Sequence, residues 1–216
     1  RGRINSDPND QFALYELVEL LWKVGEIDEA IDRCRALVKL SELSPVILEA
    51  ATRFLSDNKL FKEAVLGYRK LAELQPDRAL AHYSLGRLLQ RLGAVEESIN
   101  EHRKAIRLEP DNAECHYRFG VTLAHVGRTE EAERCYKKAI ALDPAHAKAY
   151  SNLGYLLDLK GQGENAIQLF RKAVQFNPQS AEAHFNLGAL YGETGKHERA
   201  IYEFKMAIEL DPKCAP

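Results

Sequence analysis

The sequence predicts an all-α fold in which six helix hairpins follow one another along the chain. Three observations predict it. A proline recurs every 34 residues, each period carries two apolar stripes with helical spacing, and small residues recur at fixed positions within the period. The recurring prolines are Pro76, Pro110, Pro144, Pro178 and Pro212.

Placing each proline at position 32 of a 34-residue period divides the chain into six repeats with ten residues in front. The repeats are 11–44, 45–78, 79–112, 113–146, 147–180 and 181–214. We interpret residues 1–10 as the tail of a preceding repeat or a linker, because Asp7 and Pro8 stand at late-repeat positions. We therefore expect the chain to be a segment of a longer protein.

Each repeat is expected to contain two helices, and the fourth repeat shows why. Its first half has apolar or small residues three and four apart, at Phe119, Gly120 and Leu123. Its second half repeats this spacing at Ala132, Tyr136, Ala139 and Ile140. Between the halves, a glycine can adopt the left-handed conformation that closes a helix. The five such glycines are Gly25, Gly93, Gly127, Gly161 and Gly195.

The second helix is expected to begin at acidic residues, such as Glu130 and Glu131, because the helix dipole favours negative charge at its start. The proline that follows has no amide hydrogen and ends the helix. It marks the corner between one hairpin and the next.

Small residues at two positions allow the two helices of a hairpin to approach closely, and an aromatic ring at position 24 fills the remaining space. Position 8 holds Gly86, Gly120, Gly154 and Gly188, position 20 holds Ala30, Ala64, Ser98, Ala132, Ala166 and Ala200, and position 24 holds Tyr68, Tyr136, Phe170 and Phe204. The first two repeats depart from this pattern. Val18 and Thr52 replace the glycine, and Glu42 replaces the proline, so we expect Pro45 to make that turn.

This pattern resembles the tetratricopeptide repeat family over nearly the whole chain. The fifth repeat matches the family signature at Tyr150, Leu153, Gly154, Leu157, Ala166, Phe170 and Pro178. The sixth repeat matches it at His184, Leu187, Gly188, Tyr191, Ala200, Phe204 and Pro212. The resemblance implies a right-handed superhelical α-solenoid whose first helices line a concave groove.

The resemblance also implies a function, a non-catalytic scaffold that binds a peptide segment of a partner protein in this groove. Two alternatives remain open. The chain is also consistent with a substrate-recruiting or partner-recruiting arm of a larger enzyme, for example a glycosyltransferase-like protein, and with a structural subunit of an assembly. An exposed last helix, with Ile201, Phe204 and Ile208, would favour end-to-end self-association.

Family geometry places positions 2, 5, 6, 9, 12 and 13 of each repeat on the groove. The candidate binding residues at these positions are Tyr15, Arg53, Tyr83, Arg87, Arg91, Tyr117, Arg118, Asn152, Tyr155, Phe185 and Asn186. The aromatic residues supply apolar contact at low entropy cost, although rings at position 5 also pack between repeats. The four arginines suggest a basic groove centre that prefers acidic groups of a partner, flanked by acidic ends with Glu16, Glu19, Glu182 and Glu193. A solvated charged face is the alternative.

Two known binding modes of the family can be compared residue by residue. The carboxylate clamp for chaperone C-termini is disfavoured, because only the last of its five positions matches among Glu49, Arg53, Ser84, Glu114 and Arg118. The asparagine ladder of the repeat arm of O-linked N-acetylglucosamine transferases is matched only in part. Asn152 and Asn186 fit it, whereas Glu16, Ala50, Ser84 and Arg118 do not.

Composition excludes several other classes of function. The 216 residues carry a net charge of −2, so there is no general attraction to nucleic acid, and we expect no membrane insertion because no apolar run is long enough to span a bilayer. The cysteines Cys34, Cys115, Cys135 and Cys214 form no CxxC pair, which favours reduced thiols in an intracellular protein. The histidines His82, His116 and His184 share position 4, where we expect them to pack as partly buried rings. We predict no catalytic residues, no metal site and no cofactor.

Overall fold

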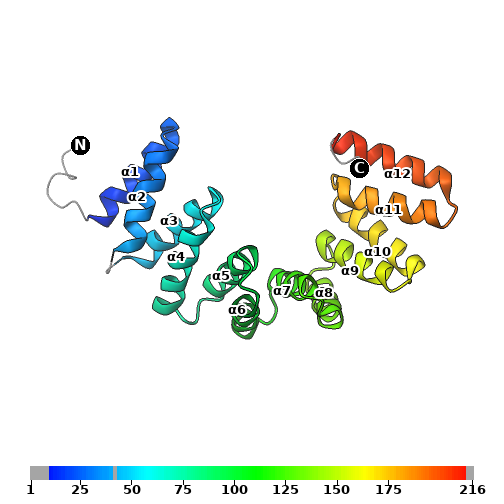
Figure 1. Ribbon diagram of the computed structural model, residues 1–216, viewed down its shortest axis with the longest axis horizontal. Coiled ribbons are helices and arrows are strands. Elements are labelled where there is room, and N and C mark those ends of the chain that lie inside the picture. Colours follow the sequence, from blue (N-terminus) through cyan, green and yellow to red (C-terminus); the bar gives the residue numbers. More distant parts are fainter. Residues whose placement is uncertain (1–9, 41–42, 213–216) are drawn as a thin grey trace. The chain divides into compact units, whose positions relative to one another are not determined.

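The structure is a computed structural model that describes residues 10–40 and 43–212. All regular secondary structure within these residues is α-helical, as the sequence predicts (Figure 1). The helices are α1 (Gln11–Val24), α2 (Ile27–Lys39), α3 (Pro45–Asp57), α4 (Phe61–Leu74), α5 (Ala79–Arg91), α6 (Val95–Leu108), α7 (Ala113–His125), α8 (Thr129–Leu142), α9 (Ala147–Leu159), α10 (Gly163–Phe176), α11 (Ala181–Glu193) and α12 (His197–Leu210). The predictions made for residues 1–9, Glu42 and Cys214 lie outside the described residues. None of the helices described is both long enough and apolar enough to cross a membrane.

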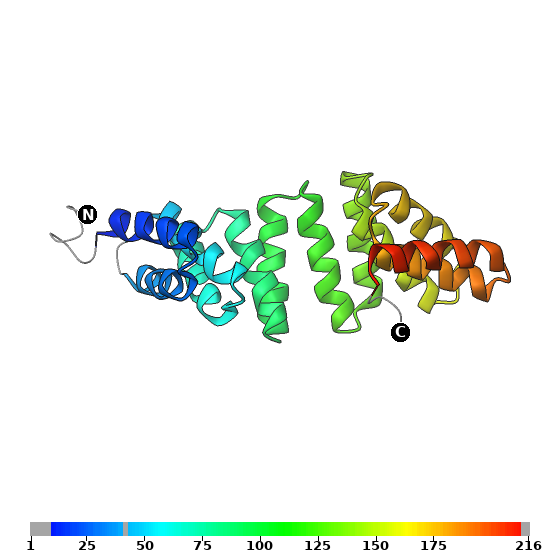
Figure 2. The ribbon, with the colours of Figure 1, turned by 90° about the horizontal axis from the view of Figure 1, so that it is seen from above.

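The chain divides after Pro110 into two compact units, each containing three hairpins. Within every hairpin the two helices lie side by side, as Figures 1 and 2 show. Within each unit the second helix of one hairpin contacts the first helix of the next, as α2 contacts α3 and α8 contacts α9. This is the stacked-hairpin arrangement that the 34-residue period predicts.

The turns inside the hairpins confirm the role of the recurring glycine. All five inter-helix glycines have positive φ, between 72° and 84°. In the second repeat the same position is occupied by Lys59, whose φ is 65°. A side chain with a Cβ adopts this conformation at an energetic cost, so this hairpin carries local strain that the glycine-bearing hairpins avoid.

The corners between hairpins confirm the role of the proline. Helices α4, α6, α8, α10 and α12 all end two residues before a proline of the 34-residue series. The exception is the first corner, where Pro45 stands in the first turn of α3, as predicted. Acidic residues occupy the first turn of the second helices, including Glu96 and Glu97 in α6.

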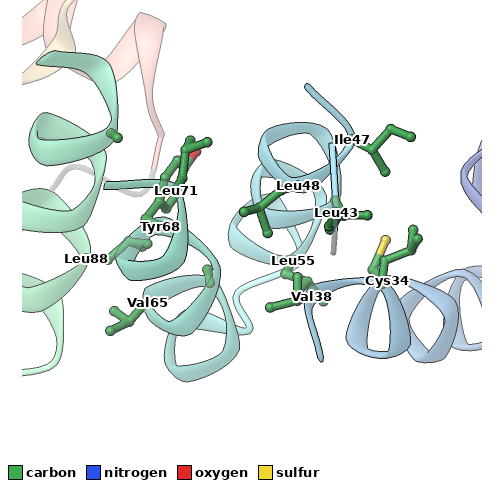
Figure 3. Packing of buried hydrophobic residues seen from close by; sticks show 14 of the residues in the cluster. Cys34, Val38, Leu43, Ile47, Leu48, Leu55, Val65, Tyr68, Leu71 and Leu88 are labelled. Carbon is green, nitrogen blue, oxygen red and sulfur yellow. The ribbon is translucent and has the colours of Figure 1, made fainter. Parts of the chain in front are cut away.

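The core of the first unit is a continuous row of buried side chains that follows the order of the helices. Figure 3 shows it running from Cys34 and Val38 through Leu48 to Tyr68 and on to Leu88 of α5. A corresponding cluster in the second unit is built from α10, α11 and α12. Each hairpin therefore buries its apolar face mainly against its neighbours in the stack.

Close packing at position 8 confirms why a small residue is needed there. A Cβ added at Gly120 would lie 2.7 Å from the ring of Tyr136. In the second repeat the small residue at this contact lies on the second helix, and the larger residue lies on the first. Thr52 occupies position 8 of α3, and the facing residue of α4 is Gly67, where an added Cβ would lie 2.0 Å from Thr52 Oγ1. The departure from the family pattern at Thr52 is thus compensated across the hairpin.

The last helix leaves part of its apolar face uncovered. Ile201 and Ile208 of α12 are exposed, and Phe204 is partly buried against Phe185. By contrast, Ile167 is buried at the position in α10 that corresponds to Ile201. The expected exposure of this face is confirmed, whereas self-association through it stays a prediction.

Candidate functional site

In the first unit, groove positions of the first two hairpins surround a cavity of about 240 Å³ between α1 and α3. Of the predicted site residues, Tyr15 and Arg53 line this cavity. The Tyr15 hydroxyl donates a hydrogen bond to Glu19 Oε1 over 2.9 Å. This bond, with some burial, raises the pKa of Tyr15 above its ordinary value, so the hydroxyl stays protonated and its ring is held beside the cavity.

Two further aromatic side chains line the same cavity and were missed in the sequence. Trp22 and Phe54 pack edge to face, with ring centroids 5.2 Å apart and ring planes at 82°. Trp22 is 52% exposed although it lies in a packed hairpin. Trp22 stands at groove position 12, so extending the search for aromatic residues beyond position 5 would have found it.

The remaining predicted residues of the first unit lie on α5 and have unequal surroundings. Tyr83 is half-buried with its ring edge towards His102, and the ring centroids are 6.4 Å apart. Arg91 is exposed, and its guanidinium lies over the ring of Phe61, 5.1 Å from the centroid. Arg87 is half-buried, and its buried Nε has no hydrogen-bond partner among the described residues. The arginines predicted for this unit are therefore not an equivalent row of open charges.

In the second unit, Tyr117 of α7 is mainly a packing residue. It is 6% exposed, and its ring lies 4.8 Å from that of His146 and 6.0 Å from that of Tyr136. Arg118 lies over the Tyr117 ring and pairs with Glu114 at 2.6 Å. The charge of Arg118 is therefore largely satisfied within α7.

A second cavity, of about 210 Å³, lies beside Tyr117 and has mostly polar walls. Asn152 of α9 lines it and donates from Nδ2 to the Tyr136 hydroxyl over 3.4 Å. Lys148, Ser151, Asn177, Ser180 and Glu182 also line it. This mixture of amide, hydroxyl and charged groups suits hydrogen bonding to a peptide better than burial of a large apolar group.

The other predicted residues of the second unit differ in exposure. Tyr155 of α9 is 54% exposed. Phe185 and Asn186 of α11 are half-buried, with the Phe185 ring 5.6 Å from that of Phe204. Tyr155 is thus the predicted aromatic residue of this unit that offers most of its side chain to a partner.

The carboxylate of Glu114 joins α7 to the start of α9. His146 accepts the Ala149 amide hydrogen at Nδ1 and caps α9, so its proton is on Nε2, which donates to Glu114 Oε2 over 3.2 Å. Burial alone would raise the pKa of Glu114, but the hydrogen bonds from His146 and Arg118 outweigh it and lower the pKa to about 2.

This lowered pKa predicts a pH-dependent effect of Glu114→Gln. Because the folded-state pKa lies below the unfolded value, Glu114 stabilises the fold above about pH 4.5, and its contribution is lost as the pH falls towards 2. The side chain is 42% exposed, so after solvent screening we expect a cost of about 1 kcal/mol at neutral pH. Urea unfolding of both proteins at neutral pH and near pH 3 measures it. Glu29→Gln, in an exposed pair with Arg33, is the control, and a difference that stays constant with pH would contradict the prediction.

Another cavity, of about 450 Å³, lies outside the predicted groove positions, between α4, α5 and α6. His82 and Glu101 line it and are bonded to each other, with Nδ1 and Oε2 2.6 Å apart. Glu101 also accepts from Lys104 over 2.7 Å. The Glu101 carboxylate is therefore already engaged by two neighbouring side chains.

The histidines at position 4 pack as predicted and also form a polar contact that the sequence analysis missed. His82 Nε2 lies 2.9 Å from the carbonyl oxygen of Pro76. His184 repeats both contacts in the second unit, with Glu203 at 2.6 Å and the Pro178 carbonyl oxygen at 3.1 Å. The signal was a glutamate at position 23, which accompanies His82 and His184 but not His116. Among residues 10–40 and 43–212, no three His, Cys, Asp or Glu side chains are grouped as metal ligands.

Family models match the chain without a gap from residue 48 to residue 214. Models described as "Tetratricopeptide repeat" match residues 48–113, 103–134 and 181–214. A model described as "TPR repeat" matches residues 123–161 and 158–195. No curated protein sequence matches the chain.

Solved structures of similar fold cover most of the chain. A crystal structure of MamA is 25% identical, with a TM-score of 0.65, and the match covers 75% of this chain and 95% of MamA. YrrB, described as a TPR protein with an unusual peptide-binding site, is 23% identical with a TM-score of 0.60, and the match covers 79% of this chain and 88% of YrrB. PilF of Pseudomonas aeruginosa is 20% identical with a TM-score of 0.72, and the match covers 76% of this chain and 75% of PilF. With its helix hairpins, its recurring prolines and these matches, the chain belongs to the tetratricopeptide repeat family.

Proposed function

We propose that this chain is a non-catalytic scaffold that holds a segment of a partner protein against the first helices of its repeats. Membership of a family of protein-interaction repeats supports the proposal, as does the peptide-binding site named for YrrB, a protein of the same fold. The cavities beside α1 and α3 and beside α7 and α9 both lie at groove positions. A groove-facing surface in each unit is thus available to side chains of a bound segment.

The observation that carries the proposal is the exposure of large aromatic side chains at groove positions. Trp22 in the first unit and Tyr155 in the second are more than half exposed. Trp and Tyr are enriched among the residues that dominate binding energy at protein interfaces, because they bury a large rigid surface at low entropy cost. Trp22 also lines the cavity between α1 and α3.

A preference for acidic groups of the partner is a finer part of the proposal. It now depends mainly on Arg87, because Arg118 pairs with Glu114, Arg91 lies over Phe61 and Arg53 shares its cavity with two carboxylates. A guanidinium that is half-buried and has an unused N–H, as in Arg87, favours a carboxylate or carbonyl acceptor.

Peptides selected from a random library against the whole chain test the proposal. We expect the affinity of groove-binding peptides to fall about tenfold in Trp22→Ala or in Tyr155→Ala, since loss of an aromatic anchor commonly costs more than 1 kcal/mol. Tyr202→Ala is the matched control, because Tyr202 is 60% exposed but lies on α12, a second helix. Fluorescence anisotropy of labelled peptides gives the affinities.

Two outcomes would contradict this function. One is a set of selected peptides whose affinity is unchanged in both Trp22→Ala and Tyr155→Ala. The other is a larger loss in Tyr202→Ala than in either groove variant, which would place binding on the second helices.

We also propose an intracellular setting for the chain. Cys34 and Cys135 are free thiols. Burial raises the pKa of Cys34 to about 12, and burial together with nearby Glu131 raises that of Cys135 to about 11. Thiols that stay protonated and buried suit a packing role rather than a redox role.

A further inference from the structure

We infer that the cavity between α1 and α3 binds an organic ammonium cation, presented as the side chain of a lysine or a methylated lysine in the bound segment. The inference deepens the proposed function and rests on it, because the cation is taken to belong to the partner that the groove holds. It concerns one cavity of about 240 Å³, whose walls come mostly from groove positions of the first two repeats.

The first argument is the arrangement of the aromatic rings. Trp22 and Phe54 stand at 82° to each other with centroids 5.2 Å apart, and Tyr15 adds a third ring to the cavity lining. The negative face of an aromatic ring attracts a cation, and Trp is the strongest of the aromatic side chains in this respect. Aromatic side chains gathered around one cavity are a known means of recognising quaternary ammonium groups.

The second argument is charge. Glu19 and Asp57 bring two carboxylates to the cavity, and Arg53 brings one guanidinium, so the lining carries a net charge of about −1 at neutral pH. The Tyr15 hydroxyl occupies one acceptor site of Glu19 at Oε1. An ionised carboxylate has roughly four such sites, so Glu19 can still accept from an ammonium group.

The third argument is the apolar floor. Val18, Ala50 and Ala51 also line the cavity, and Val18 and Ala51 are buried. A lysine side chain combines an apolar four-carbon stem with a charged end, so its stem suits this floor while its head meets the rings and carboxylates. A carboxylate or phosphate ligand would instead meet Glu19 and Asp57 at close range and be repelled.

The chain contains a direct reporter of this site, because Trp22 is its single tryptophan. Titration of the whole chain with tetramethylammonium, Nα-acetyl-lysine methylamide and Nα-acetyl-trimethyllysine methylamide should change Trp22 fluorescence in a saturable way. Nα-acetyl-norleucine methylamide has a similar stem without charge and should bind at least about tenfold more weakly. The lysine and trimethyllysine arms distinguish an ordinary from a methylated side chain as the natural occupant.

Charge variants give the signed test. We expect Glu19→Gln and Asp57→Asn each to weaken binding of trimethyllysine roughly threefold or more, and Arg53→Gln to strengthen it by a similar factor. Asp28→Asn, on the exposed side of α2, should leave the affinity unchanged. Glu19→Gln retains an oxygen that accepts from Tyr15, so it removes the charge without removing that hydrogen bond.

The inference is overturned if no ammonium probe saturates, if norleucine binds as tightly as lysine, or if Arg53→Gln weakens binding. Its failure can be told apart from failure of the proposed function. Selected peptides that still depend on Trp22 while no ammonium probe binds would leave the scaffold function standing without the cation site. Saturable cation binding, together with selected peptides whose affinity is unchanged in Trp22→Ala and Tyr155→Ala, would leave the cation site standing and contradict the proposed scaffold function.

Discussion

Gly67→Ala should lower the free energy of unfolding by about 3 kcal/mol, at the upper end of the usual cost of overpacking a core. The added Cβ would lie 2.0 Å from Thr52 Oγ1, 2.8 Å from Cγ2 and 2.9 Å from Cβ. Thr52 is fully buried, so its side chain has no space into which it can turn. Urea unfolding followed by circular dichroism measures the loss.

The same contact predicts a graded rescue by substitutions of Thr52. In the background of Gly67→Ala, Thr52→Ala removes Oγ1 and Cγ2 but keeps the Cβ at 2.9 Å, so recovery should be partial. Thr52→Gly removes all three clashing atoms and should restore stability to within about 1 kcal/mol of the natural chain, since one helical glycine has been exchanged for another. Loss of Oγ1 sacrifices no hydrogen bond, because this atom has no partner among the described residues.

A matched control separates this clash from the general effect of replacing a helical glycine. Gly192 lies in α11 with nothing within 4 Å of an added Cβ. Gly192→Ala should therefore stabilise the chain by roughly 0.5 to 1 kcal/mol, through helix propensity alone. Equal effects of Gly67→Ala and Gly192→Ala, or no rescue by Thr52→Gly, would show that the packing argument is wrong.

The exchange between Thr52 and Gly67 also shows what the period could predict about the fold. Helices, corners and turns follow from local rules, since proline and glycine act on their own segment of backbone, and these predictions are confirmed. The compensation at Gly67 is a contact across a hairpin. It involves two residues 15 positions apart, and each of them departs from the residue type found at its position in the other repeats. Comparing the repeats one position at a time therefore gives two separate departures, whereas in the structure the two residues form a single close contact.

The site was predicted less completely for a similar reason. Groove positions derived from the family include Tyr15 and Arg53, which do line a cavity, and also Tyr117, whose ring is almost fully buried. Position in a repeat determines which way a side chain points from its helix, but not how much of it the neighbouring helix covers. Trp22 and Arg118 illustrate the two outcomes, because one stays open beside a cavity and the other is paired within its own helix.

His82→Leu should cost about 3 kcal/mol, because it removes one of the two side chains that donate to the largely buried Glu101 carboxylate and leaves only Lys104. His82 and Glu101 are both largely buried, and the imidazole forms its bonds to Glu101 and to the Pro76 carbonyl only if both ring nitrogens donate. Burial would raise the pKa of Glu101, but the hydrogen bonds from Lys104 and His82 lower it overall. Leucine keeps most of the buried volume, so the loss would report the polar contacts rather than a cavity.

Another repeat of the chain has no histidine and no glutamate at these two positions, and it indicates which double variant to test. Repeat five carries Tyr150 and Leu169 at the positions of His82 and Glu101. The double variant His82→Tyr with Glu101→Leu should therefore be more stable than His82→Leu, since the largely buried carboxylate that loses its imidazole partner is removed as well. A double-mutant cycle made of His82→Tyr, Glu101→Leu and the double variant gives the coupling between the two positions.

The second unit tests whether the effect belongs to the contact or to its surroundings. His184 makes the same two hydrogen bonds, to Glu203 and to the Pro178 carbonyl oxygen, so His184→Leu should cost about as much as His82→Leu. Because the two sites share no partner, the two losses of stability should add to within roughly 0.5 kcal/mol. His125→Leu, at an exposed position in the last turn of α7, should change stability by no more than about 0.5 kcal/mol. If His82→Leu lowered stability no more than His125→Leu, the imidazole would act only by filling space. Its hydrogen bonds to Glu101 and to the Pro76 carbonyl oxygen would then contribute nothing to stability.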